Sequence, residues 1–212
     1  RPLCPPAWFP LNPYWQIRLD IRYTQSSMSQ GINASIGWST TSDAFAAGCE
    51  AARMARERLQ AIGPQLALVF GSAAFDQHQL VRGVRSVVGS TALVGGSTAG
   101  EIVSEGPLTN SCTVLLLSSV TLAWSAGLGE SLHTDPRKVG RQAAFDAVKG
   151  LAVTQRIGFL FFGDGLATSY ADVVRGLQEV LGTSFLVTGG LAGDDLRFSR
   201  TYQYFNDQVV SD

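Results

Sequence analysis

The chain has 212 residues, of which 45% are hydrophobic and 16% are charged, with a formal net charge of -1 at pH 7. This balance excludes a disordered chain, because enough apolar surface can be buried to offset the entropy of ordering. The near-zero charge also argues against binding to nucleic acid or to an anionic membrane. The cysteines and the two histidines, His78 and His133, lack the spacing of a disulfide framework or a metal site. We therefore expect a cytoplasmic protein without a metal.

Residues 1–27 form a proline-rich arm ahead of the expected domain, residues 28–212. Five of the eight prolines lie in this arm, together with Trp8 and Trp15. Proline at this density prevents a helix and disfavours a central strand. Two interpretations stay open: Met28 is the natural start and the arm is not native, or the arm packs its tryptophans on the domain.

An internal repeat runs through residues 28–212. The segment that begins at Gly37 matches the one that begins at Gly129 without a gap, as far as Phe70-Gly71 and Phe162-Gly163. After one added residue, residues 96–101 match residues 189–194, with Gly96 opposite Gly189. Chance does not readily give so long a register, so we predict two equivalent halves, about residues 31–122 and 123–212.

Each half is expected to have the order α-β-α-β-β-β. Asp43 and Asp135 can cap helices by accepting from first-turn amides. The predicted helices cover residues 43–62, 76–88, 136–150 and 169–181, and the predicted strands 66–70, 91–94, 157–162, 184–187 and 202–205. Residues 106–129 carry no charge, but their polar interruptions favour two buried strands with a turn near Ser118 over a membrane helix.

Strand–helix alternation predicts an α/β fold with mixed, largely parallel sheets flanked by helices. An antiparallel hairpin is expected at residues 111–127. In the second half, Asn206-Asp207 is predicted as a turn with no strand returning from it. The second half is therefore expected to be truncated at Asp212.

Two glycine-rich loops in each half follow predicted strands. Ligands bind at the carboxyl ends of parallel strands, and glycine lets a ligand approach the backbone amides closely. Amides for a carboxylate and acidic side chains for an amine would suit a small zwitterion; the alternative is that the loops are only tight turns. The candidate ligand-binding residues are Gly71, Ser72, Gly95, Gly96, Ser97, Thr98, Gly100, Glu101, Gly163, Asp164, Gly165, Gly189, Gly190, Gly193 and Asp194.

These linked glycine motifs, at residues 70–71 with 95–101 and at residues 162–165 with 189–194, resemble the FIST sensory domain, in particular its N-terminal part. The resemblance runs from about residue 32 to the end. It implies a non-enzymatic signal-input module that binds small ligands such as amino acids. It also implies a FIST C-terminal domain beyond residue 212 and an output partner of the histidine kinase, cyclic-di-nucleotide or chemotaxis type.

Two alternatives accompany this resemblance. Some members resemble nitric-oxide sensors that hold haem, and haem needs an axial ligand; His78 and His133 are candidates only in the loosest sense. A small hydrolase that uses Ser72 or Ser97 is the other alternative, although the glycine-flanked serine motif of such enzymes is absent from the sequence.

Overall fold

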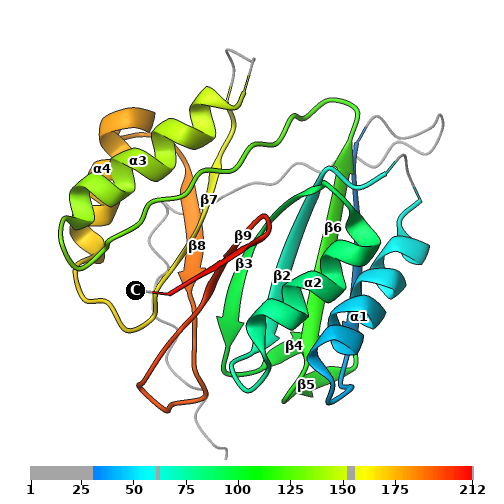
Figure 1. Cartoon of the computed structure of the whole chain (residues 1–212). Helices are drawn as coiled ribbons and strands as arrows, with labels where there is room; N and C mark the ends of the chain where they lie inside the picture. Colours follow the sequence, from blue (N-terminus) through cyan, green and yellow to red (C-terminus); the bar gives the residue numbers. More distant parts are fainter. Residues whose placement is uncertain (1–30, 61–62, 152–155, 212) are drawn as a thin grey trace, which may run out of the picture.

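The computed structural model describes residues 31–60, 63–151 and 156–211, so the proline-rich arm and both interpretations of it lie outside the described residues. Four helices and ten strands occur within those ranges (Figure 1). In chain order they are β1 (Ile32–Ser39), α1 (Ala44–Arg58), β2 (Leu66–Ser72), α2 (Gln77–Val88), β3 (Ala92–Thr98), β4 (Glu101–Val103), β5 (Gly106–Leu108), β6 (Cys112–Ser119), α3 (Pro136–Lys149), β7 (Phe159–Gly163), α4 (Tyr170–Leu181), β8 (Val187–Leu191), β9 (Gln203–Phe205) and β10 (Gln208–Val210).

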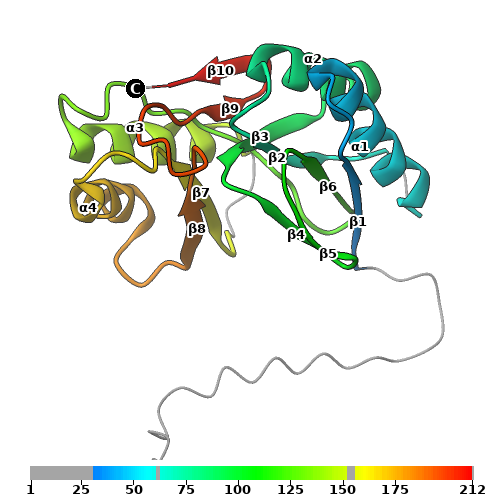
Figure 2. The same ribbon diagram turned by 90° about the horizontal axis from the view of Figure 1, so that it is seen from below.

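The strands form one large sheet and two pairs. The large sheet has the order β1-β6-β2-β3-β9-β10, β4 pairs with β5, and β7 pairs with β8. We call the large sheet with α1 and α2 the first lobe, and β7, β8, α3 and α4 the second lobe. The two lobes lie side by side (Figure 1). Seen from below, α1 and α2 cover one face of the large sheet, and the β4–β5 hairpin lies away from them (Figure 2).

The α/β class and the flanking helices are confirmed. Asp43 accepts from the Ala46 amide at 2.8 Å and Asp135 from the Lys138 amide at 2.9 Å, so both predicted caps form. Parallel pairing is restricted to β2–β3 and β7–β8 among the described strands, because β1, β6 and β9 enter the large sheet antiparallel to their neighbours. The sheets are therefore mixed, with a smaller parallel share than expected.

Glycines set the close helix packing in both lobes. A Cβ added at Gly83 of α2 would lie 2.2 Å from the Phe45 carbonyl oxygen of α1. A Cβ at Gly176 of α4 would lie 2.1 Å from the Arg137 carbonyl oxygen of α3. In both helix pairs, a glycine of one helix therefore lets the backbone of the other helix approach closely. The duplication of the halves itself stays a prediction.

Several predicted boundaries are corrected by the strand pairing. Residues 111–127 hold no hairpin: β6 is one strand buried between β1 and β2, and residues 122–131 have no regular structure. The predicted helix 43–62 ends at Arg58. β8 starts at Val187 rather than residue 184, because Val187 is the partner of Phe159. No strand was predicted at β1, where small and polar residues obscure the alternation.

The strand predicted not to return from the turn at Asn206 is present. β10 pairs antiparallel with β9, and Asn206 has a φ of 53°, which suits a tight turn. The hairpin extends the large sheet because β9 pairs with β3 of the first lobe. The second half of the sequence therefore contributes strands to the first lobe.

Each lobe has its own buried cluster. The first contains Val69, Leu80, Leu93 and Leu116 and is much the larger, whereas Ala144, Val173 and Leu177 form the centre of the second. None of the helices in the described ranges is both long and apolar enough to cross a membrane.

Candidate ligand site at the strand exits

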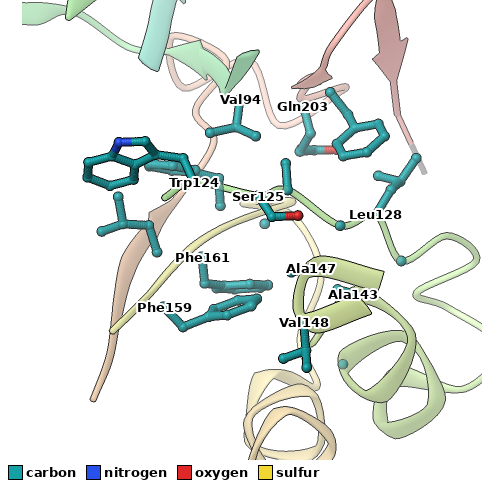
Figure 3. Close-up of a pocket in the computed structure, with 18 of the residues that line it drawn as sticks. Val94, Trp124, Ser125, Leu128, Ala143, Ala147, Val148, Phe159, Phe161 and Gln203 are labelled. Carbon is teal, nitrogen blue, oxygen red and sulfur yellow. The ribbon is translucent and has the colours of Figure 1, made fainter. Parts of the chain in front are cut away.

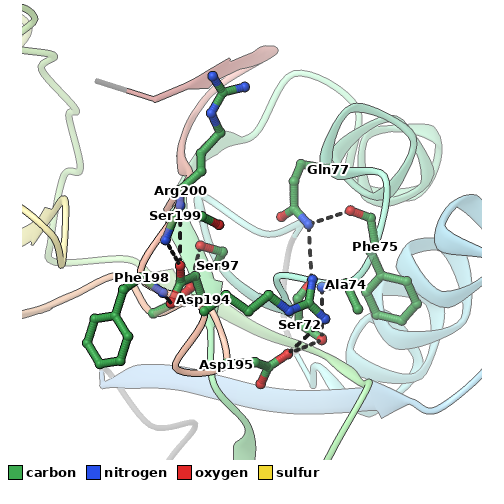
Figure 4. Close-up of polar contacts among 12 residues, drawn as sticks. Ser72, Ala74, Phe75, Gln77, Ser97, Asp194, Asp195, Phe198, Ser199 and Arg200 are labelled. Carbon is green, nitrogen blue, oxygen red and sulfur yellow. Dashed lines mark hydrogen bonds and ion pairs between the residues drawn. The ribbon is translucent and has the colours of Figure 1, made fainter.

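The loops that leave β3 and β8 contact each other directly. The Gly193 amide donates to the Ser97 carbonyl oxygen at 2.8 Å, and Ser97 Oγ donates to the Gly193 carbonyl oxygen at 2.7 Å. Ser97 Oγ also accepts from the Tyr202 amide at 2.9 Å, and its residue is only 1% exposed. The structure therefore brings the second glycine loops of the two halves together, with Ser97 between them (Figure 4).

Ser72 lies at the end of β2, beside the same junction. Its Oγ accepts from the Ala74 amide at 3.2 Å and lies 3.5 Å from Oδ2 of Asp195 (Figure 4). The buried Gln77 side chain donates to the Ser72 carbonyl oxygen at 3.1 Å, and its own oxygen accepts from the Tyr204 hydroxyl. Gly71 is next to this group, since an added Cβ there would meet Leu80 and approach the Tyr204 hydroxyl.

Glu101 is buried at the start of β4, below the loop that contains Gly100, whose φ is 144°. Its carboxylate accepts hydrogen bonds from the hydroxyls of Thr98 and Ser111. Desolvation by burial raises the pKa of Glu101, and these two hydrogen bonds oppose the shift only in part. The carboxyl group predicted to bind an amine is therefore held inside the protein by two hydroxyls.

Asp194 fixes the loop that follows it. Its carboxylate accepts from the backbone amides of Phe198 at 3.2 Å, Ser199 at 2.7 Å and Arg200 at 3.2 Å (Figure 4). The Ser199 amide, followed by the other amides, lowers the pKa of Asp194, against the opposing effect of desolvation. These three hydrogen bonds stabilise a loop that has a positive φ at Asp195.

Asp164 follows β7 and is also buried. Its Oδ1 accepts from the Leu166 amide at 2.8 Å and from the Thr201 hydroxyl. An added Cβ at the neighbouring Gly165 would lie 1.8 Å from the Ala192 carbonyl oxygen, so the two glycine loops of the second half touch each other. Asp164 therefore connects β7 to the segment that leads into β9.

The strand register shifts the alignment of the glycine loops by one residue. Val69 of β2 pairs with Gly95, and its sequence match Phe161 pairs with Gly189. Gly95 and Gly189 have φ values of 154° and 158°, and a Cβ at either would lie 1.8 Å from the carbonyl oxygen of its partner. Gly95, rather than the predicted Gly96, therefore occupies the place of Gly189. Gly96 instead faces the Tyr202 carbonyl oxygen, and Gly190 has open space beside it.

A cavity of about 580 Å³ lies between the lobes (Figure 3). Of the predicted site residues, Gly95, Gly163 and Asp164 line it, at the end where β3 and β7 approach one another. The other predicted residues lie in the hydrogen-bonded junction or the loops around it.

Most of the cavity wall was not predicted. Its lining is largely apolar and comes from residues 121–130, the inner face of α3, the edge of β7 and the β9–β10 hairpin. The charge-free stretch of residues 106–129 was the one signal in the sequence, and it pointed to strands rather than to a cavity wall.

The residues present do not fit a haem group. His78 and His133 are both exposed, and neither lines the cavity. Among the described residues that line the cavity, Tyr204 is the one side chain of an axial-ligand type, and its hydroxyl donates to Gln77. Burial raises the pKa of Tyr204 well above its ordinary value, which opposes the phenolate that iron would need. Within the described ranges, no group of three or more His, Cys, Asp or Glu side chains could hold a metal ion.

The serines also have structural partners in place of a catalytic base. Ser97 Oγ is occupied by two backbone groups, and the one acidic partner of Ser72, Asp195, is 3.5 Å away. No hydrogen bond joins either serine to a histidine in the part of the chain that the structure describes. This geometry lacks the serine–base contact by which a nucleophilic hydroxyl is activated.

These features define an α/β domain whose two lobes meet through glycine loops at the strand exits. The family model described as FIST N domain matches residues 65–212, from the start of β2 through β10. The chain therefore belongs to the FIST N family, a family of sensory, signal-transduction domains. The expected resemblance is confirmed, although β1 and α1 lie outside the matched range. No curated protein matches the chain.

Proposed function

We propose that this chain is the signal-input domain of a cytoplasmic sensory protein, and that it binds a small polar metabolite, such as an amino acid, between its lobes. The observation that carries the proposal is the cavity between the lobes, which Gly95, Gly163 and Asp164 line next to the loops that join the lobes. Asp164 is the carboxylate that a ligand amine would meet there. The predicted carboxylates Glu101 and Asp194 support the loops that surround the site.

The junction suggests how binding would be transmitted. Ser97 and Gly193 hold the lobes together by two hydrogen bonds, so a ligand beside them would favour one relative position of the lobes. Coupling of this kind is typically about 1–3 kcal/mol. The proposal includes a FIST C-terminal domain beyond residue 212 and an output partner of the histidine kinase, cyclic-di-nucleotide or chemotaxis type, which would read that position.

A thermal-shift experiment with the twenty amino acids and small carboxylates tests the ligand. A ligand that binds only the folded state adds about 2.7 kcal/mol at one hundred times its Kd. For a domain of this size that corresponds to a rise in melting temperature of about 5–10 °C. A flat response to every compound would contradict ligand binding.

The variant Asp164→Asn tests the site. Asparagine keeps an oxygen that can accept from the Leu166 amide but removes the negative charge, so the ligand-induced shift should fall sharply while the unliganded protein stays folded. Asp172→Asn is the matched control, because its side chain is 48% exposed on α4. An unchanged shift in Asp164→Asn would place the ligand elsewhere.

A further inference from the structure

In the first lobe, β6 fills the space between β1 and β2. It pairs antiparallel with both, and Cys112, Val114 and Leu116 are fully buried along it. Gly37 of β1 lets this strand approach α1, because an added Cβ there would lie 2.2 Å from the Ala51 carbonyl oxygen and 2.5 Å from the Ala55 nitrogen. The layer thus consists of three strands under one helix.

The second lobe contains counterparts of β1 and β2, the two strands that flank β6 in the first lobe. A Cβ added at Gly127 would lie 2.1 Å from the Ala143 carbonyl oxygen and 2.5 Å from the Ala147 nitrogen, so residues 122–131 rest on α3 as β1 rests on α1. β7 pairs with β8 as β2 pairs with β3. Between Gly127 and β7 lies the cavity, in the position that β6 occupies in the first lobe.

Among the described strands β7 pairs only with β8, so its other edge faces the cavity. The Phe159 amide donates to the Leu186 carbonyl oxygen at 2.9 Å, and the Gly163 carbonyl oxygen accepts from the Ala192 amide at 2.7 Å. Odd-numbered residues of β7 therefore face β8. Because strand residues alternate, the N–H and C=O groups of Leu160 and Phe162 point to the opposite edge, which the cavity borders.

The side chains around the cavity are incompletely covered. Leu160 is 43% exposed, whereas Leu68, its sequence match in β2, is 7% exposed. The Trp124 indole Nε1 is buried, borders the cavity (Figure 3) and has no hydrogen-bond partner among the described residues. A backbone carbonyl brought by an added strand would satisfy such a donor.

We propose that this cavity is a strand-binding slot that takes up one extended, apolar peptide segment of a partner polypeptide, antiparallel to β7. The added strand hydrogen-bonds to the free edge of β7 and places small or medium apolar side chains, at alternate positions, against Ala143 and Ala147 of α3. Main-chain pairing supplies much of the affinity, and the apolar wall selects the sequence. The slot occupies the apolar length of the cavity and leaves Asp164 at its polar end.

The probe is a synthetic peptide with the sequence of residues 112–119, in which Ser replaces Cys112 and lysines are added for solubility. We expect saturable binding that changes the fluorescence of Trp124 and slows hydrogen exchange at the amides of Leu160 and Phe162. A peptide of the same composition in scrambled order should not bind. Failure of the ordered peptide to bind would overturn the proposal.

A second peptide tests the main-chain hydrogen bonds without any change to the protein. Methylation of alternate backbone nitrogens removes the hydrogen bonds to one edge without removing apolar side chains. The peptide that is methylated on the edge facing β7 should bind at least about tenfold more weakly than the unmethylated peptide. A loss of about 1.4 kcal/mol of binding free energy gives a factor of ten. Equal binding of the methylated and unmethylated peptides would show a non-specific apolar contact and refute strand addition.

Two proline variants locate the edge. Leu160→Pro removes the N–H that points into the slot and should abolish peptide binding. Val187→Pro is the matched control, because Leu186 and Ala192 show that even-numbered residues of β8 face β7, so the Val187 N–H points away from it. Peptide binding retained in Leu160→Pro would contradict the proposal. Amino-acid binding without peptide binding would refute the slot and leave the ligand proposal standing.

Discussion

The two buried carboxyl groups at the strand exits have different surroundings: those of Asp194 stabilise the ionised form, and those of Glu101 favour the protonated form. Asp194 accepts three backbone amides, whereas Glu101 lies among two hydroxyls and near the buried thiol of Cys112, whose pKa burial raises far above its ordinary value. The pKa values of the two carboxyl groups are therefore shifted in opposite directions, although the sequence repeat aligns the two residues with each other.

Glu101→Gln should become more stable relative to the wild type as the pH rises. Burial raises the pKa of Glu101 in the folded state, so the folded protein holds its proton more tightly than the unfolded chain. The stabilisation is complete below the unfolded pKa of about 4.3 and is lost as the pH rises through the folded pKa. Urea unfolding at several pH values between about 4 and 8 measures the difference between the two proteins. A difference in unfolding free energy that does not change with pH would contradict a raised pKa of Glu101 in the folded state.

Asp194→Asn should lower the melting temperature at pH 7. Backbone amides lower the pKa of Asp194, so its stabilisation is present above the unfolded pKa of about 3.9 and is lost as the pH falls through the folded pKa. The gap to the wild type should therefore narrow at acidic pH. Glu105→Gln, on an exposed turn, serves as the control and should leave the melting curve unchanged at every pH.

Helix pairs in this protein cross where glycine replaces a side chain. α1 and α2 meet at Gly48 and Gly83, and α3 and α4 meet at Gly140 and Gly176, in each case with backbone of the partner helix in the space of the absent Cβ. Four glycines in helix interiors lower intrinsic helix propensity, by about 1 kcal/mol each relative to alanine. The close approach that they permit is the tertiary gain that outweighs this effect.

Gly83→Ala should destabilise the protein by about 1–3 kcal/mol, despite the better helix propensity of alanine. Its Cβ would lie 2.2 Å from the carbonyl oxygen of Phe45, and rigid backbone cannot move as a flexible side chain can. Arg82→Ala, at the adjacent exposed position, should change the unfolding free energy by less than about 0.5 kcal/mol. Urea unfolding measures the unfolding free energy of both variants. An unchanged unfolding free energy in Gly83→Ala would mean that α1 and α2 can move apart at little cost.

The two lobes differ in how well they are supported. The first has a six-stranded sheet and a large buried cluster, whereas the second has two strands and a small one. A two-stranded sheet is marginal by itself. The contacts at Ser97 and the insertion of β9 beside β3 therefore hold the second lobe to the first.

Ser97→Ala should loosen that junction and lower the unfolding free energy by about 1–3 kcal/mol, because the Tyr202 amide loses its acceptor and the Gly193 carbonyl oxygen loses its donor. Hydrogen exchange should accelerate in β8 and β9 and stay unchanged in β1 and α1. Ser104→Ala, on the exposed β4–β5 turn, is the control. Uniform acceleration through both lobes would contradict the view that Ser97 acts at the junction.

Local signals in the sequence predicted the helices well. Asp43 and Asp135 mark helix starts because a capping carboxylate acts on amides within one turn, and the apolar runs of β2 and β7 need no distant partner to be recognised. The strand β1 escaped prediction because its burial depends on pairing with β6, far along the chain.

The sequence by itself determined the helices, the order of the strands β2, β3, β7, β8 and β9 between and after them, the glycine loops and the family, because caps, turns and apolar periods act over a few residues. Only the tertiary structure decided that the β9–β10 hairpin joins the first lobe and that β6 is a single central strand. It also decided that Glu101 and Asp194 turn inward and that β7, paired only with β8 among the described strands, borders a cavity. Strand pairing and burial bring together residues about a hundred positions apart, and no local pattern records which partners meet.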